Sequence, residues 1–166
     1  GQADRLRSEL RRLALGGNRF DIRAARALSA TLVHTRSLAT LALSRARIGE
    51  VEMEALEAGL KAAAPSLTAL DLGHNTFGSR GGSVVARLFE NPGCSLKNVD
   101  LQWNKIQGEG AVELGLALGK NDSVTRLDLS YNGLGPKGAQ FVSEGISHNV
   151  ALTFLDLSAN GVDATA

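Results

Sequence analysis

The sequence has few or none of the features that several protein classes require. Its single cysteine, Cys94, excludes an internal disulfide and a cysteine-ligated zinc site, and it suits the reducing cytosol. No apolar run approaches the roughly 18 residues of a membrane span. The formal net charge of +1 gives no strong electrostatic attraction to nucleic acid or anionic lipid. We therefore expect a cytoplasmic chain that binds neither nucleic acid nor membrane.

Catalytic signatures are also absent from the sequence. It contains no H-E-x-x-H, C-x-x-C or G-x-S-x-G motif. The Gly-rich stretch 78–82 is not followed by the Gly-Lys-Ser/Thr of a phosphate-binding loop. Four glutamates between residues 50 and 57 fit a solvated helix face better than acid–base chemistry. The sequence thus predicts a protein that is not an enzyme and needs no cofactor or metal.

One pattern, L-x-x-L-x-L-x-x-N-x-L, recurs six times along the chain. Neighbouring copies are 28 or 29 residues apart, and they begin at Leu10, Leu38, Leu67, Leu96, Val124 and Leu152. Within each copy apolar and outward-facing positions alternate, as in a short strand. Between copies apolar residues recur at helical spacing, as at Met53, Leu56 and Leu60. Each repeat is therefore expected to contain one strand and one helix.

Such units bury their apolar faces only by stacking on their neighbours. Strands that recur after a long connection are parallel. The sequence thus predicts an α/β solenoid, a single domain over residues 1–166 with parallel strands on a concave face and helices on the convex face. The strands are expected near residues 12–16, 40–44, 69–73, 98–102, 126–130 and 154–158.

An asparagine recurs where each strand turns. Its amide can donate to and accept from the backbone groups inside such a bend. Stacking would place five of these residues in a ladder, namely Asn18, Asn75, Asn104, Asn132 and Asn160. The second repeat has Ala46 at this position, where we expect a local weakness.

Three columns of outward positions are candidates for binding, because equivalent positions of stacked strands lie about 4.8 Å apart. One column contains Ala14, Ala42, Asp71, Asp100, Asp128 and Asp156. A second contains Arg12, Thr40, Ala69, Asn98, Arg126 and Phe154. The third, just after each strand, contains Gly17, Arg45, His74, Trp103, Tyr131 and Ala159.

The third column holds the only tryptophan and the only tyrosine of the chain. Exposed Trp and Tyr are typical binding hot spots, although Trp103 packing on its own turn is an alternative. The aspartates either belong to the repeat framework or attract a basic partner that relieves their mutual repulsion. We predict a partner-binding surface for a basic peptide or helix, with cation–π contacts to Trp103. Its residues are His74, Trp103, Tyr131, Asp71, Asp100, Asp128, Asp156 and Arg126.

The repeat resembles the ribonuclease-inhibitor-like class of leucine-rich repeats. The segment Leu127-Asp128-Leu129-Ser130-x-Asn132-x-Leu134-Gly135-x-x-Gly138-Ala139 carries the resemblance, and neighbouring repeats hold near copies of its opening. The resemblance implies a horseshoe with strands on the concave face. Family members include ribonuclease inhibitor, Ran GTPase-activating protein, the sensing arms of nucleotide-binding receptors and axonemal scaffolds.

These observations favour a protein-interaction scaffold that binds its partner on the concave face. Two alternatives stay open: a GTPase-activating regulator using Arg45 or Arg47, and a ligand-sensing receptor arm. A cytoskeletal or axonemal location and a place in a larger assembly are compatible with the scaffold. The charged segment 4–12 resembles the end of a preceding helix, and the last repeat stops before its helix. We therefore expect a piece of a longer protein, truncated at both ends.

Overall fold

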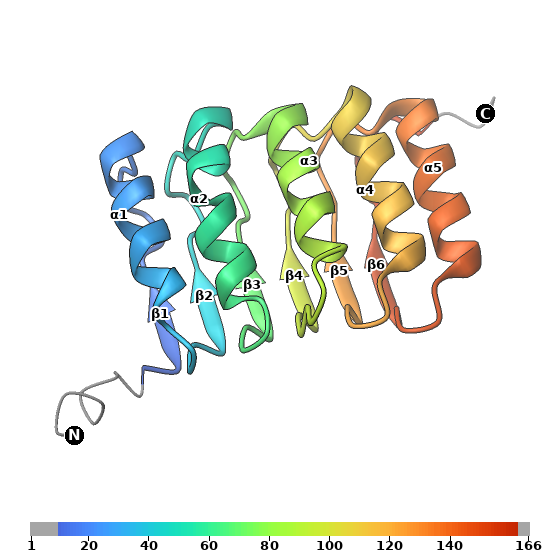
Figure 1. The fold of residues 1–166 in the computed structure, drawn as a ribbon. Helices are drawn as coiled ribbons and strands as arrows, with labels where there is room; N and C mark the ends of the chain where they lie inside the picture. Colours follow the sequence, from blue (N-terminus) through green and yellow to red (C-terminus); the bar gives the residue numbers. More distant parts are fainter. Residues whose placement is uncertain (1–9, 163–166) are drawn as a thin grey trace, which may run out of the picture.

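The computed structural model describes residues 10–162, which form a row of strand–helix units (Figure 1). The strands of this part are β1 (Arg12–Ala14), β2 (Thr40–Ala42), β3 (Ala69–Asp71), β4 (Asn98–Asp100), β5 (Arg126–Asp128) and β6 (Phe154–Asp156). Its helices are α1 (Ile22–Val33), α2 (Glu50–Ala63), α3 (Gly78–Phe89), α4 (Gly108–Lys120) and α5 (Gly135–His148). Within residues 10–162, no helix is long and apolar enough to cross a membrane.

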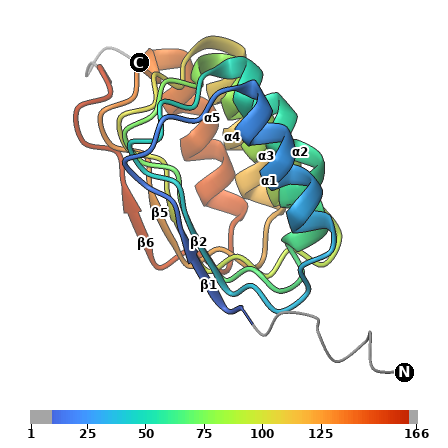
Figure 2. The same ribbon diagram turned by 90° about the vertical axis from the view of Figure 1, so that its left-hand side faces the viewer.

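The strands and helices form two layers around one core. All six described strands pair in parallel and in sequence order. Figure 2 shows the strands on one side of the molecule and the helices on the other. Leucines of both layers meet between them, and Leu41, Leu70 and Leu114 are at most 1% exposed. The predicted α/β solenoid is confirmed, and we call its outer strand side the strand face.

The strands are shorter than the five-residue ranges expected from the sequence. Each one occupies only the first three residues of its range, for example Asn98–Asp100 within 98–102. All six described strands end at the same turn, β1 and β2 with Ala14 and Ala42, and in β3 to β6 the last residue is an aspartate that accepts a hydrogen bond from the backbone N–H two residues later. This turn bends the chain away from the ladder.

The start of the described chain also differs from expectation. Residues 10–12 are not helical, and Arg12 already begins β1. The carbonyl of Arg11 accepts bonds from the N–H groups of Ala39 and Thr40, which ties this segment to the sheet. Residues 4–9 of the expected helix end lie outside the described residues.

The register aligns equivalent positions of neighbouring repeats. Leu70 pairs with Val99, and Asp71 pairs with Asp100. The same alignment holds between β4 and β5 and between β5 and β6. Side chains at one repeat position therefore form continuous columns across the strand face.

The asparagines form a ladder beneath the turns. Asn104 is fully buried, and its Nδ2 donates to the carbonyls of Leu72, Leu101 and Gln102. Its Oδ1 accepts from the N–H of Asn75, which belongs to the preceding repeat. Asn75, Asn132 and Asn160 join two repeats in the same way, whereas the exposed Asn18 bonds only to Leu15 of its own repeat.

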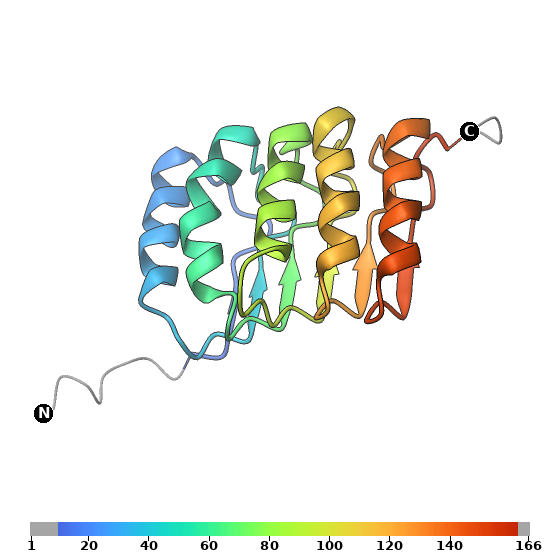
Figure 3. The ribbon, with the colours of Figure 1, turned by 45° about the vertical axis from the view of Figure 1, so that its right-hand side comes forward.

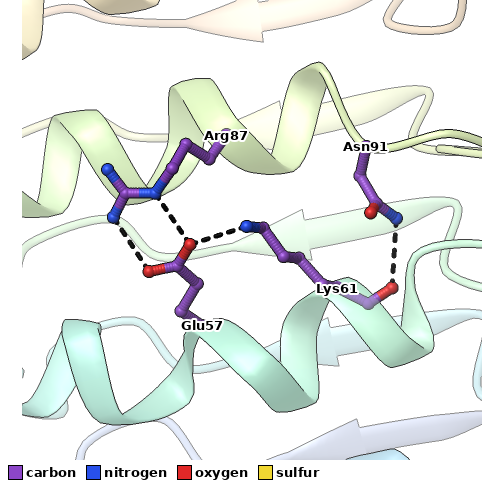
Figure 4. A network of polar contacts seen from close by, with 4 residues as sticks. All are labelled: Glu57, Lys61, Arg87 and Asn91. Carbon is purple, nitrogen blue, oxygen red and sulfur yellow. Dashed lines mark hydrogen bonds and ion pairs between the residues drawn. The ribbon is translucent and has the colours of Figure 1, made fainter.

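The helix layer shows two kinds of contact between neighbouring helices. Glu57 of α2 accepts bonds from Arg87 of α3 at 2.7 and 2.8 Å and from Lys61 at 2.7 Å (Figure 4). The hydrogen bonds from Arg87 lower the pKa of Glu57 to about 2, helped by Lys61 and opposed by burial. Helices α4 and α5 lie side by side (Figure 3) and approach through glycines, because a Cβ at Gly145 would collide with the carbonyl of Gly115.

Helix α5 departs from the expected pattern at its last apolar residue. The spacing of Ala139, Val142 and Ile146 predicts one buried face, and Val142 is indeed fully buried. Ile146 is 38% exposed. The reason is the position of α5, the last described helix of the row, on which no further helix packs (Figure 1).

Candidate protein-interaction surface

Three ring side chains, His74, Trp103 and Tyr131, stack in a row just beyond the ends of β3, β4 and β5, and we call them the ring column. The ring centroids of Trp103 and Tyr131 are 4.4 Å apart, with their planes 8° from parallel. His74 and Trp103 have centroids 6.0 Å apart and planes at 11°. Trp103 is 48% exposed and Tyr131 is 46% exposed, so the core does not require either ring.

The backbone that carries the ring column is the same in every described repeat. The residue before the asparagine position has a positive φ in all six, with 76° at Gly17 and 53–56° at Arg45, His74, Trp103, Tyr131 and Ala159. The N–H of each of the first five donates to a carbonyl of the next repeat, as from Trp103 to Ser130. The left-handed conformation costs a residue other than glycine about 1 kcal/mol. Since Gly, Ala and Arg occupy the same conformation, the fold does not select rings here.

The aspartates Asp71, Asp100, Asp128 and Asp156, which we call the aspartate column, act first as turn residues. Oδ1 of Asp71 accepts from the N–H of Gly73 at 3.0 Å, and Asp156 accepts from Ser158 at 2.8 Å. Asp128 accepts from both the N–H and the hydroxyl of Ser130. Within residues 10–162, Oδ2 of Asp71 and Oδ2 of Asp128 form no hydrogen bond or ion pair. The column thus has a role in the framework and also keeps carboxylate oxygens available to a ligand.

Asp100 occupies the most electrostatically unfavourable place in this column. Burial raises its pKa, two hydrogen bonds from Gln102 lower it, and the charges of Asp71 and Asp128 raise it further. Asp156 at the end of the column differs, because hydrogen bonds from Ser158 lower its pKa. A cation placed over Asp100 would therefore relieve a charge that the protein itself leaves uncompensated.

Arg126 lies on the neighbouring outward position of the strand face. Its guanidinium carbon is 4.1 Å from the centre of the ring of Phe154, which is its register partner on β6. Arg126 and Phe154 line one end of a hollow of about 320 Å³, whose other walls include Ala69, Val99 and the first three aspartates of the column.

A second recess lies beside the ring column. It measures about 400 Å³ and is lined by Arg45, His74, Asp71, Asp100 and Gln102, together with three small residues of the first two repeats. The structure therefore brings His74 together with two of the predicted aspartates. Asp156 lines neither this recess nor the hollow.

A profile of the leucine-rich-repeat family matches the chain over residues 63–86, 94–115 and 120–143. These segments are leucine-rich repeats. The repeat family expected from the sequence is thereby confirmed for this part of the chain. No curated protein matches the leucine-rich-repeat chain in sequence.

Solved structures of similar fold include domains of tropomodulin and leiomodin-1. The C-terminal domain of tropomodulin from Caenorhabditis elegans has a TM-score of 0.65 and 18% identity, over 87% of this chain and 89% of that one. A leiomodin-1 structure described as actin-binding site 2 also has a TM-score of 0.65 and 18% identity, over 83% and 79% of the two chains. At this identity the likeness shows the leucine-rich-repeat fold alone.

Sequence reasoning missed three residues of this leucine-rich-repeat surface. Phe154 and Arg45 stood in the outward columns, but neither was included in the predicted site. Their signal was present in the sequence: Phe154 follows Arg126 by one repeat, and Arg45 precedes His74 by one repeat. Gln102, which bonds to both oxygens of Asp100, had no such signal because it lies outside the three columns.

Proposed function

We propose that this chain is a protein-interaction module that binds its partner through the ring column and the adjoining aspartate column. The main support is the position before the ladder asparagine. Six different residue types adopt the same backbone conformation there, and the three rings among them follow one another in consecutive repeats. The turn would form equally well with glycine or alanine. Large exposed rings at such a position are best explained by binding.

The charges beside the rings indicate the chemistry of the partner. Asp71, Asp100 and Asp128 lie on adjacent strands in direct register. The raised pKa of Asp100, due first to burial, marks a site where a bound cation lowers the free energy. A Lys or Arg side chain bound here pairs with the carboxylates and meets the rings at their sides, since Trp103 is stacked between His74 and Tyr131 and a cation–π contact needs an open ring face. We infer that the partner presents a basic peptide or helix.

The similar structures support a protein as partner. The leiomodin-1 structure is described as an actin-binding site, so this fold serves protein binding in at least one other chain. A cytoplasmic or cytoskeletal scaffold within a larger assembly fits both the fold and this surface.

The GTPase-regulator alternative is less well supported by the surroundings of Arg45. That residue shares its recess with Asp71 and Asp100. Two carboxylates beside an arginine repel the several negative charges of a nucleotide's phosphates more strongly than the single charge of a partner carboxylate. We therefore favour protein binding at this recess.

The test compares capture of partners by the wild type and by Trp103→Ala/Tyr131→Ala. The matched control is Leu116→Ala/Ile146→Ala, because these side chains are 44% and 38% exposed on helices α4 and α5. Captured proteins are identified by mass spectrometry, and the affinity of the dominant one is measured by titration. We expect the ring variant to weaken binding by tenfold or more, roughly the effect of losing a hot spot, and the control to bind as the wild type does. Equal binding by the ring variant would assign the interaction to another face.

A further inference from the structure

Charge is unevenly distributed along the solenoid, although the whole chain is close to neutral. Residues 10–47 contain eight arginines, no lysine and a single carboxylate, for a net charge of +7. Residues 48–162 contain eight basic and thirteen acidic residues, for a net charge of −5. The first repeat and the strand and turn that open the second therefore differ in sign from the rest of the described chain.

The arginines of residues 10–47, which we call the basic end, are exposed and form no ion pair within residues 10–162. They are Arg11, Arg12, Arg19, Arg23, Arg26, Arg36, Arg45 and Arg47. The one carboxylate, Asp21, is used as the N-cap of α1, where it accepts from the N–H of Ala24 at 2.9 Å. Every ion pair within residues 10–162 lies beyond the basic end, as between Glu57 and Arg87 or Glu90 and Lys120. The basic end thus carries positive charge that this part of the chain does not neutralise.

The change of sign crosses the strand face itself. The aspartate column begins at Asp71, and its register partner on β2 is Ala42. Arg45 occupies the ring position one repeat before His74, and both line the recess beside the ring column. Arg12 lies on β1, in the same outward row as Arg126. A ligand running along the strand face therefore meets Arg12 on β1 and Arg45 just beyond β2, and then the aspartate column from β3 onward, where Arg126 is the one arginine on the described strands.

The length of the face sets the size of such a ligand. Six strands at about 4.8 Å spacing span about 24 Å between the first and the last. A helix rising 1.5 Å per residue covers that distance with about 16 residues. One helix lying across the strands can therefore contact both charge regions at once.

We propose that the partner of this surface is a charge-segregated protein segment, with basic residues over β3 to β5 and acidic residues over β1 and β2. This inference rests on the proposed function, because it places the basic part of the partner at the ring and aspartate columns. A nucleic acid or an anionic membrane fits less well, since a polyanion extending past the second repeat meets the aspartate column. Segregation of charge also fixes the direction in which the segment lies.

The test uses synthetic alanine-based helical peptides of about 16 residues, a length that spans the face. One peptide has lysines in one half and glutamates in the other. A second has the same composition with the two charges alternating, and a third carries lysines only. Binding is followed by the fluorescence of Trp103, the only tryptophan, and by anisotropy of labelled peptide at low and high salt.

We expect the segregated peptide to bind about tenfold more tightly than its alternating isomer at low salt, and the preference to shrink as salt screens the charges. Arg12→Glu/Arg45→Glu should abolish the preference. Arg23→Glu/Arg26→Glu changes the net charge equally on helix α1, and it should leave the preference in place.

Three results overturn this proposal. The first is equal affinity for the segregated and the alternating peptide. In that case the proposed function itself survives if the lysine peptide binds the wild type and does not bind Trp103→Ala/Tyr131→Ala. The second is that none of the three peptides binds, which contradicts the proposal of a charge-segregated partner. Tighter binding of a DNA oligonucleotide or of anionic vesicles, lost in Arg12→Glu/Arg45→Glu, would assign the basic end to a polyanion instead.

Discussion

Repeats 1 and 2 share their backbone with repeats 3 to 5 but carry different side chains on it. In both regions the strand is three residues long, and the residue before the asparagine position has a positive φ. Repeats 1 and 2 have Gly17 and Arg45 at that position, whereas repeats 3 to 5 have three stacked rings. The aspartate column likewise begins only at repeat 3. The fold requires the strand and the turn that both regions share. The side chains that differ between the regions are not required by the fold and are available for binding.

The largest expected loss of stability comes from removing an asparagine of the ladder, which belongs to the backbone framework that the two regions share. Asn104→Ala removes a fully buried amide that bonds to three carbonyls and to the N–H of Asn75. The backbone groups left unpaired should lower the free energy of unfolding by about 3 kcal/mol. Urea unfolding measures this change. Asn18→Ala is the control, because Asn18 is exposed, and it should cost less than about 1 kcal/mol. Equal losses in the two variants would mean that the ladder does not hold the repeats together.

A second change makes the two regions more alike. Ala46→Asn places an amide at the one vacant position of the ladder, where its oxygen can accept from backbone N–H groups of the first repeat. Such a bond contributes about 1 kcal/mol, so we expect the free energy of unfolding to rise by about that amount. Ala46 is fully buried, and a loss of stability instead would show that this repeat has no room for the larger side chain.

The junction between the two regions is sensitive to pH. Glu57 of α2 has a pKa lowered to about 2 by Arg87 of α3, from an ordinary value of 4.5. Because the folded pKa is depressed, the stabilisation is complete above about pH 4.5 and is lost as pH falls toward 2. Arg87 is 44% exposed, so solvent screening limits the contribution to about 1 kcal/mol.

Glu57→Gln should therefore lower the stability at pH 7 and flatten its pH dependence between pH 4.5 and 2. Thermal unfolding across this range measures both. Glu144→Gln is the matched control, since Glu144 lies exposed on α5 and its side chain forms no ion pair within residues 10–162. A steep acid dependence that persists in Glu57→Gln would place its origin elsewhere.

The smallest effect on stability is expected where the two regions differ most. Trp103→Ala keeps the positive φ that Ala159 adopts in the same position. The variant loses ring stacking worth about 0.5–1 kcal/mol, and the core is unaffected. A loss beyond about 2 kcal/mol in urea unfolding would instead make the ring a structural element.

The sequence revealed the parts of the molecule that repeat. Leucine spacing predicted the strands, the helices and the columns, because a fixed period places equivalent residues side by side. The turn geometry was harder to predict. Nothing in the pattern shows that Trp103 or Arg45 adopts a left-handed backbone, since that conformation is imposed by bonds to the next repeat.

Contacts between different positions were also beyond the sequence. The pairing of Glu57 with Arg87 depends on how two helices face each other, and a period of 28 or 29 residues does not specify this. The pairing of Arg126 with Phe154 required the register of β5 and β6. The exposure of Ile146 follows from the end of the described row, which no local pattern reveals.

The central claim is that the ring and aspartate columns contact the partner, and hydroxyl-radical footprinting of the complex with the captured partner tests it most directly. Trp, Tyr, Phe and His side chains oxidise readily when exposed, so the method reports on the ring column and on Phe154 without mutation. We predict that oxidation of Trp103, Tyr131 and Phe154 falls in the complex, while that of Leu116 and Ile146 on the helices stays unchanged. Protection of Leu116 and Ile146 with unchanged oxidation of Trp103 and Tyr131 would contradict the claim and assign binding to the helices.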